Sequence, residues 1–142
     1  MNGRPEPDTP SAWLLRARSD LVAGRAILAA RGALPEDAAF HAQQCAEKAM
    51  KALLIQRRQA FPRTHVLEYL LDLLEQAGVT VPTEAQEAVR LTQYAVEVRY
   101  PGVWQPVSPE EADEALELAE RILCWVEGQV SQWAERGTGA QG

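Results

Sequence analysis

The sequence has few of the residues that build disulfide or metal scaffolds. Its 142 residues include two cysteines and two histidines, and Cys45 and Cys124 each lie within an apolar pattern typical of a helix. Disulfide-rich secreted domains and structural zinc sites need more such residues at short spacing. We therefore interpret both cysteines as packed thiols, and we expect neither a metal site nor a cofactor.

Long hydrophobic runs are also missing from the chain. No stretch approaches the roughly 18 apolar residues that a membrane-spanning helix needs. The opening residues, MNGRPEPDTP, lack the apolar segment of a secretory signal. These observations predict a cytoplasmic protein with no membrane association.

Positive charge and aromatic residues are scarce. The formal net charge is -6, aromatic residues make up 6%, and Lys48 and Lys51 are the only lysines among 14 basic residues. Proteins that wrap duplex nucleic acid nonspecifically usually have a broadly basic surface. The composition argues against that class, although it leaves room for a local basic pocket.

What the sequence does contain is alanine, leucine and valine in helical patterns. Apolar residues make up 46% and charged residues 24%, which is typical of one folded domain of this length. Such residues favour packed helices over strands. We expect a flexible arm over residues 1–8, a helical bundle over 9–135 and a disordered tail over 136–142.

Start and stop signals predict five helices in the bundle. Their expected ranges are Thr9 to about Arg31, Pro35–Asp37 to about Arg58, Thr64 to Ala77, Thr83 to about Arg99, and Ser108 to about Ala134. Thr9, Thr64, Thr83 and Ser108 are the expected N-caps. This order predicts an all-α, antiparallel up-and-down bundle with a four-helix core and the short third helix packed at one end. Alanines on the second helix allow close approach, so we expect that helix to be central.

The segment FHAQQCAEKAMKALL, residues 40–54, carries a polar stripe opposite its apolar one. Helical periodicity aligns four residues at i, i+3, i+7 and i+10: His41, Gln44, Lys48 and Lys51. Two ammonium groups and an imidazole on adjacent turns could bind phosphate. Alternatively, the stripe is a solvated face neutralised by Glu47 and Asp37.

Two residues near the predicted end of the fourth helix are further candidates. Arg99 could hold a phosphate or a carboxylate through two hydrogen bonds, or it could cap carbonyls and pair with a nearby acid. Tyr100 could stack on a base, although covering the edge of the core is the interpretation we favour.

Asp20 and His65 are supporting candidates. Asp20 lies between apolar positions of the first helix, where it could face the second helix and pair with Lys48 or Gln44. His65 could act as a general base, or it could be a helix-end packing residue.

Three segments together resemble the HEPN domain family: FHAQQCAEKAMKALL, THVLEYLL at residues 64–71, and RYPG at 99–102 before a capped last helix. The resemblance implies an all-α bundle, frequent homodimers, and nucleotide or RNA binding. It also implies pairing with a minimal nucleotidyltransferase in prokaryotic two-component systems of the toxin–antitoxin kind.

Many members of the wider family are metal-independent ribonucleases with an arginine, four to six residues, and then a histidine. Arg99 occupies the place of that arginine, but residues 100–106 contain no histidine. Arg58 and His65 have the required spacing, yet they bridge the second and third helices. The resemblance therefore leaves the catalytic residues unassigned.

Large aromatic residues near the last helix give a separate reason to expect a dimer. Trp104, Trp125 and Trp133 are more than a small bundle easily buries, so a partner subunit could cover some of them.

The sequence leaves three functions open. The first is a nucleotide- or RNA-binding homodimer that works with a nucleotidyltransferase. The second is a ribonuclease in which His41 or His65 replaces the missing histidine. The third is an interaction module that binds a protein partner and no nucleotide.

Overall fold

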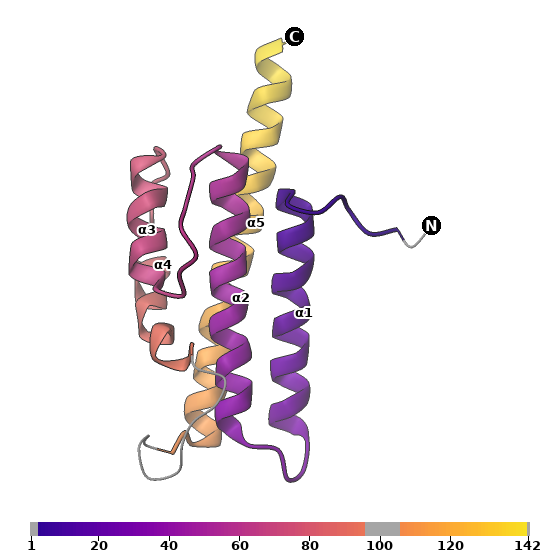
Figure 1. Cartoon of the computed structure of the whole chain (residues 1–142), viewed down its shortest axis with the longest axis vertical. Coiled ribbons are helices and arrows are strands. Elements are labelled where there is room, and N and C mark those ends of the chain that lie inside the picture. The colour runs from indigo at the N-terminus through magenta and orange to yellow at the C-terminus, as the bar shows by residue number, and fades with distance from the viewer. Residues whose placement is uncertain (1–2, 96–105, 142) are drawn as a thin grey trace.

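The computed structural model of the chain describes residues 3–95 and 106–141. Within these ranges the secondary structure is helical: α1 (Pro10–Ala29), α2 (Pro35–Gln56), α3 (Leu67–Gln76), α4 (Thr83–Gln86), the 3-10 helix η1 (Glu87–Tyr94) and α5 (Pro109–Gln141). Figure 1 shows α1 descending, α2 rising beside it, and α5 rising behind them. The predicted all-α bundle is confirmed.

Two of the expected helix caps are confirmed. The Thr9 hydroxyl accepts a hydrogen bond from the backbone N–H of Ala12 at 3.2 Å, with Pro10 in the first helical position. The Ser108 hydroxyl likewise accepts from the backbone N–H of Glu111 at 3.0 Å. Both side chains satisfy a backbone donor that has no partner within the helix.

The other two expected caps are wrong. α3 begins at Leu67, and the hydroxyl of Thr64 instead accepts from the N–H of Val66 in the preceding turn. Thr83 is the first residue of α4, with Pro82 in the capping position and no side-chain cap. A threonine followed three residues later by glutamine marks a helix start, but it does not distinguish the cap from the position after it.

Helix α2 lies at the centre of the bundle, as expected. It contacts α1, α3, η1 and α5, and its alanines are fully buried: Ala38, Ala39, Ala42, Ala46, Ala49 and Ala52. α2 and α5 run in the same direction, since Cys45 lies beside Ala119 and Gln56 beside Val130. Small side chains at these positions let the neighbouring backbones approach closely.

Beyond α2 the connections differ from the expected ones. Residues 57–66 turn back alongside α2, which brings His65 next to Gln43 (Figure 1). α3 therefore packs along the side of α2 rather than at an end of the bundle. The expected fourth helix is only partly α-helical, because a single turn of α-helix continues as the 3-10 helix η1, and its expected end near Arg99 lies outside the described residues.

Helix α5 is longer than its pattern predicts. It continues to Gln141, past the expected end near Ala134, and its last turns extend beyond α1 and α2 (Figure 1). The division of the chain into arm, bundle and tail stays a prediction. No helix in the described ranges is long and apolar enough to cross a membrane.

Candidate functional site

One buried carboxylate holds two residues of the polar stripe. Asp20 on α1 is 9% exposed and faces α2. Its Oδ1 lies 2.8 Å from Nδ1 of His41, and its Oδ2 accepts a hydrogen bond from the Lys48 ammonium at 2.7 Å. The sequence left Lys48 and Gln44 open as partners of Asp20, and the structure shows that the partner is Lys48. These three residues form what we call the Asp20 cluster.

The geometry of the Asp20 cluster determines which nitrogen of His41 is available. An ionised carboxylate only accepts hydrogen bonds, so Nδ1 carries the proton and Nε2 is the nitrogen left for another partner. The His41 and Lys48 side chains are 28% and 24% exposed, while that of Asp20 is 12% exposed. The cluster therefore presents two partly exposed side chains, an imidazole and an ammonium group, beside a buried carboxylate.

A second buried carboxylate, Glu47, organises a separate group. Its Oε2 accepts from the Lys51 ammonium at 2.9 Å, and its Oε1 lies 2.7 Å from Nδ1 of His65. Gln43 donates to the same Oε1 at 3.1 Å and also to the backbone oxygen of His65. These four residues form the Glu47 cluster, which attaches the 57–66 connector to α2.

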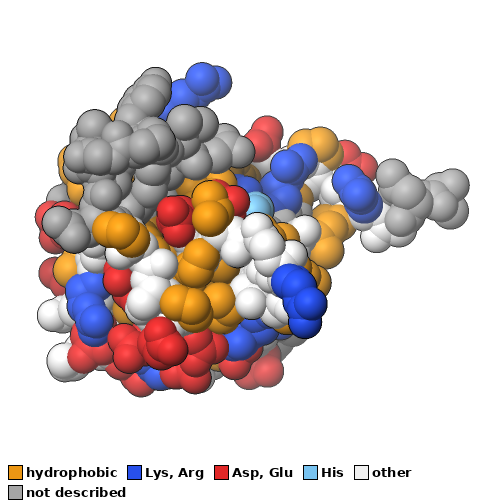
Figure 2. Space-filling view, turned by 90° about the horizontal axis from the view of Figure 1, so that it is seen from below, with side chains coloured by type: hydrophobic (Ala, Val, Ile, Leu, Met, Phe, Trp, Pro, Cys, Tyr) orange, Lys and Arg blue, Asp and Glu red, His pale blue; other side chains and the backbone are white. Residues whose placement is uncertain are grey.

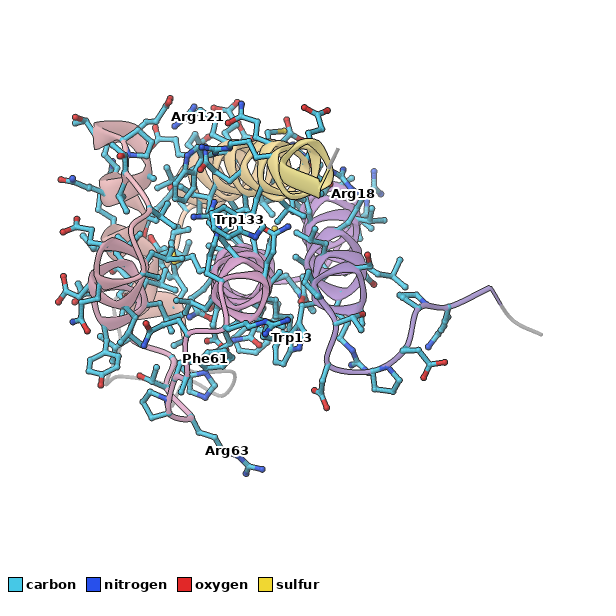
Figure 3. All side chains as sticks on the ribbon, turned by 90° about the horizontal axis from the view of Figure 1, so that it is seen from above. Trp13, Arg18, Phe61, Arg63, Arg121 and Trp133 are labelled. Carbon is cyan, nitrogen blue, oxygen red and sulfur yellow. The ribbon has the colours of Figure 1, made fainter. Side chains whose placement is uncertain are left out.

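Lys51 is buried, unlike the other lysine of the stripe. It is 7% exposed. Its ammonium lies 5.9 Å from the ring centre of Trp13 and 5.7 Å from that of Phe61. Figure 3 shows these two aromatic residues on the same side of α2. Two aromatic rings and a carboxylate together stabilise the buried ammonium group. Lys51 therefore links α1, α2 and the connector.

The four residues of the expected stripe therefore do not share one environment. His41 and Lys48 contact Asp20, whereas Lys51 contacts Glu47. Gln44 donates to the side-chain oxygen of Gln43 at 2.6 Å and so connects to the Glu47 cluster.

Sequence reasoning missed Gln43, Trp13 and Phe61 as members of this network. Gln43 is fully buried and polar, and its spacing of four residues from Glu47 is the signal that could have identified it. No comparable signal exists for the contact of Lys51 with Trp13 and Phe61, because these residues come from three separate segments.

Three candidates from the sequence remain: His65, Arg99 and Tyr100. His65 precedes α3 in the connector, and its side chain is 65% exposed. Arg99 and Tyr100 lie outside the described residues.

Cys45 lies near the Asp20 cluster but is not a candidate nucleophile. Burial, with a smaller contribution from the charge of Asp20, raises the pKa of its thiol to about 12. A thiol with such a pKa stays protonated at neutral pH and reacts slowly. Cys124, expected to be a packed thiol, is exposed instead. Across the described ranges, no three His, Cys, Asp or Glu residues are placed to share a metal ion.

Negative charge is concentrated away from the Asp20 cluster. Figure 2 shows acidic side chains along the edge that α5 forms. The exposed acids of its first turns are Glu110, Asp113, Glu114, Glu117 and Glu120. Two arginines of α1 pair with this helix, Arg25 with Glu120 at 3.0 Å and Arg18 with Glu127 at 2.8 Å. That hydrogen bond with Glu127 raises the pKa of Arg18.

Comparisons with known proteins agree on one family. The family model for the HEPN domain matches residues 10–129. A crystal structure of ST0689, an archaeal HEPN homologue, is 32% identical with a TM-score of 0.65, covering 86% of this chain and 98% of the homologue. A crystal structure of TT1696 from Thermus thermophilus is 34% identical with a TM-score of 0.66, covering 84% of this chain and 96% of that protein. No curated protein matches the chain.

Proposed function

Because the chain belongs to the HEPN domain family, we propose that it binds the phosphate of a nucleotide or of single-stranded RNA at the Asp20 cluster. The observation that carries this proposal is the pairing of His41 and Lys48 with the two oxygens of one buried carboxylate. That pairing fixes an ammonium and an imidazole side by side, so little side-chain entropy is lost when they meet an anion.

The two lysines have different roles in this proposal. Lys48 contacts phosphate, since part of its side chain reaches solvent. Lys51 is buried, and it supports the site through its contacts with Glu47, Trp13 and Phe61. Gln44 contributes a polar contact beside them. We propose that Arg99, which lies outside the described residues, supplies a further positive charge to the bound phosphate.

The test compares Lys48→Ala with Arg31→Ala, in which an exposed arginine outside the cluster is removed. Lys48→Ala should weaken binding of a labelled mononucleotide or RNA oligomer by about tenfold, the effect of roughly 1.4 kcal/mol. It should also lower the slope of log affinity against log salt, because one phosphate contact is lost. Arg31→Ala should change neither quantity. Equal affinity and slope for Lys48→Ala and the parent protein would refute the proposal.

The double variant Lys48→Ala with Lys51→Ala is a weaker test, because Lys51 is buried. Its loss leaves Glu47 without its cation in a site that water barely reaches, which destabilises the fold. Thermal unfolding of Lys51→Met should show this loss of stability.

We also propose that the protein acts as a homodimer, together with a nucleotidyltransferase partner. Trp133 is 44% exposed and Tyr69 is 47% exposed, and large exposed rings of this kind are common where a partner docks. Sedimentation equilibrium should give twice the mass of the chain. A monomer at tens of micromolar would argue against the homodimer. A stoichiometric protein partner whose binding ignores nucleotide would favour the plain interaction module.

A metal-independent ribonuclease is the second candidate, and a specific observation favours it. Each histidine has Nδ1 against a buried carboxylate, His41 on Asp20 and His65 on Glu47. This arrangement orients an imidazole to accept a proton at Nε2. His41 is the better base because Lys48 lies beside it to stabilise negative charge on the phosphate.

In that reaction the 2′-oxygen loses its proton to Nε2 of His41 and attacks the adjacent phosphorus. The bond to the 5′-oxygen breaks, that oxygen takes up a proton from water, and a 2′,3′-cyclic phosphate and a 5′-hydroxyl end remain. Incubation of RNA with the protein and a chelator should yield cyclic-phosphate ends that disappear in His41→Ala and persist in His65→Ala. RNA that stays intact would reject the enzyme.

A further inference from the structure

A groove beside the Asp20 cluster has no role in the function proposed so far. It has a volume of about 1050 Å³, and its walls are residues 3–8 and the first turns of α1. Lys48 is the residue of α2 that lines it, so the groove begins at the proposed phosphate site. Its size is sufficient for a small ligand, since such sites typically measure about 300–1,000 Å³.

The charges in the groove suit an anion better than those of the other described cavity. Arg4, Arg16 and Lys48 line the groove together with Glu6 and Asp8. The second cavity, of about 200 Å³ between η1 and α5, is lined by two arginines and three glutamates: Arg90, Arg121, Glu111, Glu114 and Glu117. Lys48 already pairs with Asp20, so the groove adds Arg4 and Arg16 against Glu6 and Asp8, and its lining is less acidic than that of the second cavity.

The outer wall of the groove is held in place by local hydrogen bonds. The Thr9 hydroxyl donates to the backbone oxygen of Glu6 at 2.7 Å and accepts from the N–H of Ala12. Asp8 adopts the left-handed conformation, with a φ of 60°, which an aspartate tolerates better than most residues. Residues 6–9 therefore form a turn attached to the start of α1.

An aromatic ring completes the groove. Trp13 lines it and also packs near the Lys51 ammonium, which fixes the indole relative to α2. Aromatic side chains next to arginines are how proteins hold single-stranded nucleic acid without reading its sequence, because every base has a face that can stack.

We propose that this groove binds the next nucleotide of a single-stranded RNA whose first phosphate lies at Lys48. Arg16 and Arg4 contact the following phosphate, and Trp13 provides a surface for a base. This inference rests on the proposed function, and it makes the ligand an oligonucleotide rather than a mononucleotide.

The experiment measures fluorescence anisotropy with a labelled mononucleotide, a dinucleotide and a hexanucleotide. The test variant is Arg4→Ala with Arg16→Ala. The control is Arg31→Ala with Arg121→Ala, which changes the net charge equally at exposed positions outside the groove. Since the mononucleotide lacks both the stacking and the second phosphate contact, the parent protein should bind the hexanucleotide at least about tenfold more tightly than the mononucleotide.

The groove variant should lose that preference for length and keep its affinity for the mononucleotide, while the control keeps both. In Trp13→Phe, the hexanucleotide should quench less of the protein fluorescence. Equal hexanucleotide affinities for the groove variant and the control would overturn the inference, and mononucleotide binding that depends on Lys48 would still support the proposed function. If neither ligand binds the parent protein, the proposed function itself fails.

Discussion

Gly24 lies where α1 packs tightly against α2 and α5. A Cβ at this position would lie 2.5 Å from a methyl carbon of Leu116, 3.2 Å from the backbone oxygen of Ala38 and 3.3 Å from Cβ of His41. Leu116 is fully buried, so it has little room to move away. The absence of a side chain here lets α1 pack closely against α2 and α5, one turn along α1 from Asp20.

We therefore predict that Gly24→Ala destabilises the protein, although alanine is the better helix former. Overpacking of this kind costs about 1–3 kcal/mol, more than the roughly 1 kcal/mol that alanine gains in helix propensity. Chemical denaturation should show the loss. Gly128→Ala is the matched control, because a Cβ there meets nothing within 4 Å, and it should be neutral or stabilising.

The two cysteines should differ sharply in reactivity. Cys45 is fully buried with a thiol pKa of about 12, while Cys124 is exposed. A thiol reagent at pH 8 should modify one cysteine in the folded protein and both after unfolding, and Cys124→Ser should abolish the folded-state reaction. Rapid modification of Cys45 in the folded protein would contradict its burial.

The raised pKa of Cys45 predicts that the free energy of unfolding depends on pH. The folded state keeps the Cys45 proton up to a pKa of about 12, whereas the unfolded chain releases it near the ordinary value of 9.0. Between these values the folded state binds more protons, so the contribution of Cys45 to stability is present below pH 9 and decreases as the pH rises above it. A Cys45→Ala variant should lose less stability over that range than the parent protein.

At the scale of the elements, the long helix α5 is attached to α2 near their C-terminal ends. The guanidinium of Arg57 lies 4.0 Å from the ring centre of Trp133, and Gln56 donates to the backbone oxygen of Val130 at 2.9 Å. Burial, and then the positive charge of Arg136, lowers the pKa of Arg57. The stacking contact thus holds Arg57 against a repulsive neighbour.

We predict that Arg57→Ala and Trp133→Ala each loosen the last turns of α5, with little effect on the rest of the bundle. A double-mutant cycle should give a coupling of about 0.5–1 kcal/mol, the usual size for a partly exposed cation over an aromatic ring. Arg136→Ala is the control. It removes the positive charge that repels Arg57, so it should not lower the free energy of unfolding. Purely additive effects of Arg57→Ala and Trp133→Ala would show that the contact contributes nothing.

At the scale of the whole molecule, the helices are not equally well supported. α2 is surrounded by α1, α3, η1 and α5, whereas α4 is a single turn and η1 is a 3-10 helix on the side of the bundle. Short 3-10 segments have weaker hydrogen-bond geometry than α-helices. The side formed by α4 and η1 should therefore open first.

Native-state hydrogen exchange should follow this order. Amides of residues 83–94 should exchange through local opening, and those in the middle of α2 should exchange only through global unfolding. Amides of α2 that exchange as fast as those of η1 would show that the bundle opens as one unit.

The sequence by itself determined the helices whose signals are local. The caps at Thr9 and Ser108 and the alanine face of α2 were all readable, because each depends on neighbours a few residues away in the chain. The resemblance of three segments was enough to identify the family. Where two local signals competed, as with Pro82 and Thr83, the boundary was predicted wrongly.

Only the tertiary structure decided how the polar stripe is used. His41 and Lys48 acquire their partner from α1, and Lys51 is enclosed by residues of α1 and the connector. The pattern of α1 offered Asp20 as a partner for Lys48 or Gln44, but no pattern indicated that Asp20 also contacts His41 or that Trp13 and Phe61 enclose Lys51. The division of one stripe between the partly exposed His41 and Lys48 and the buried Lys51 is therefore a property of helix packing.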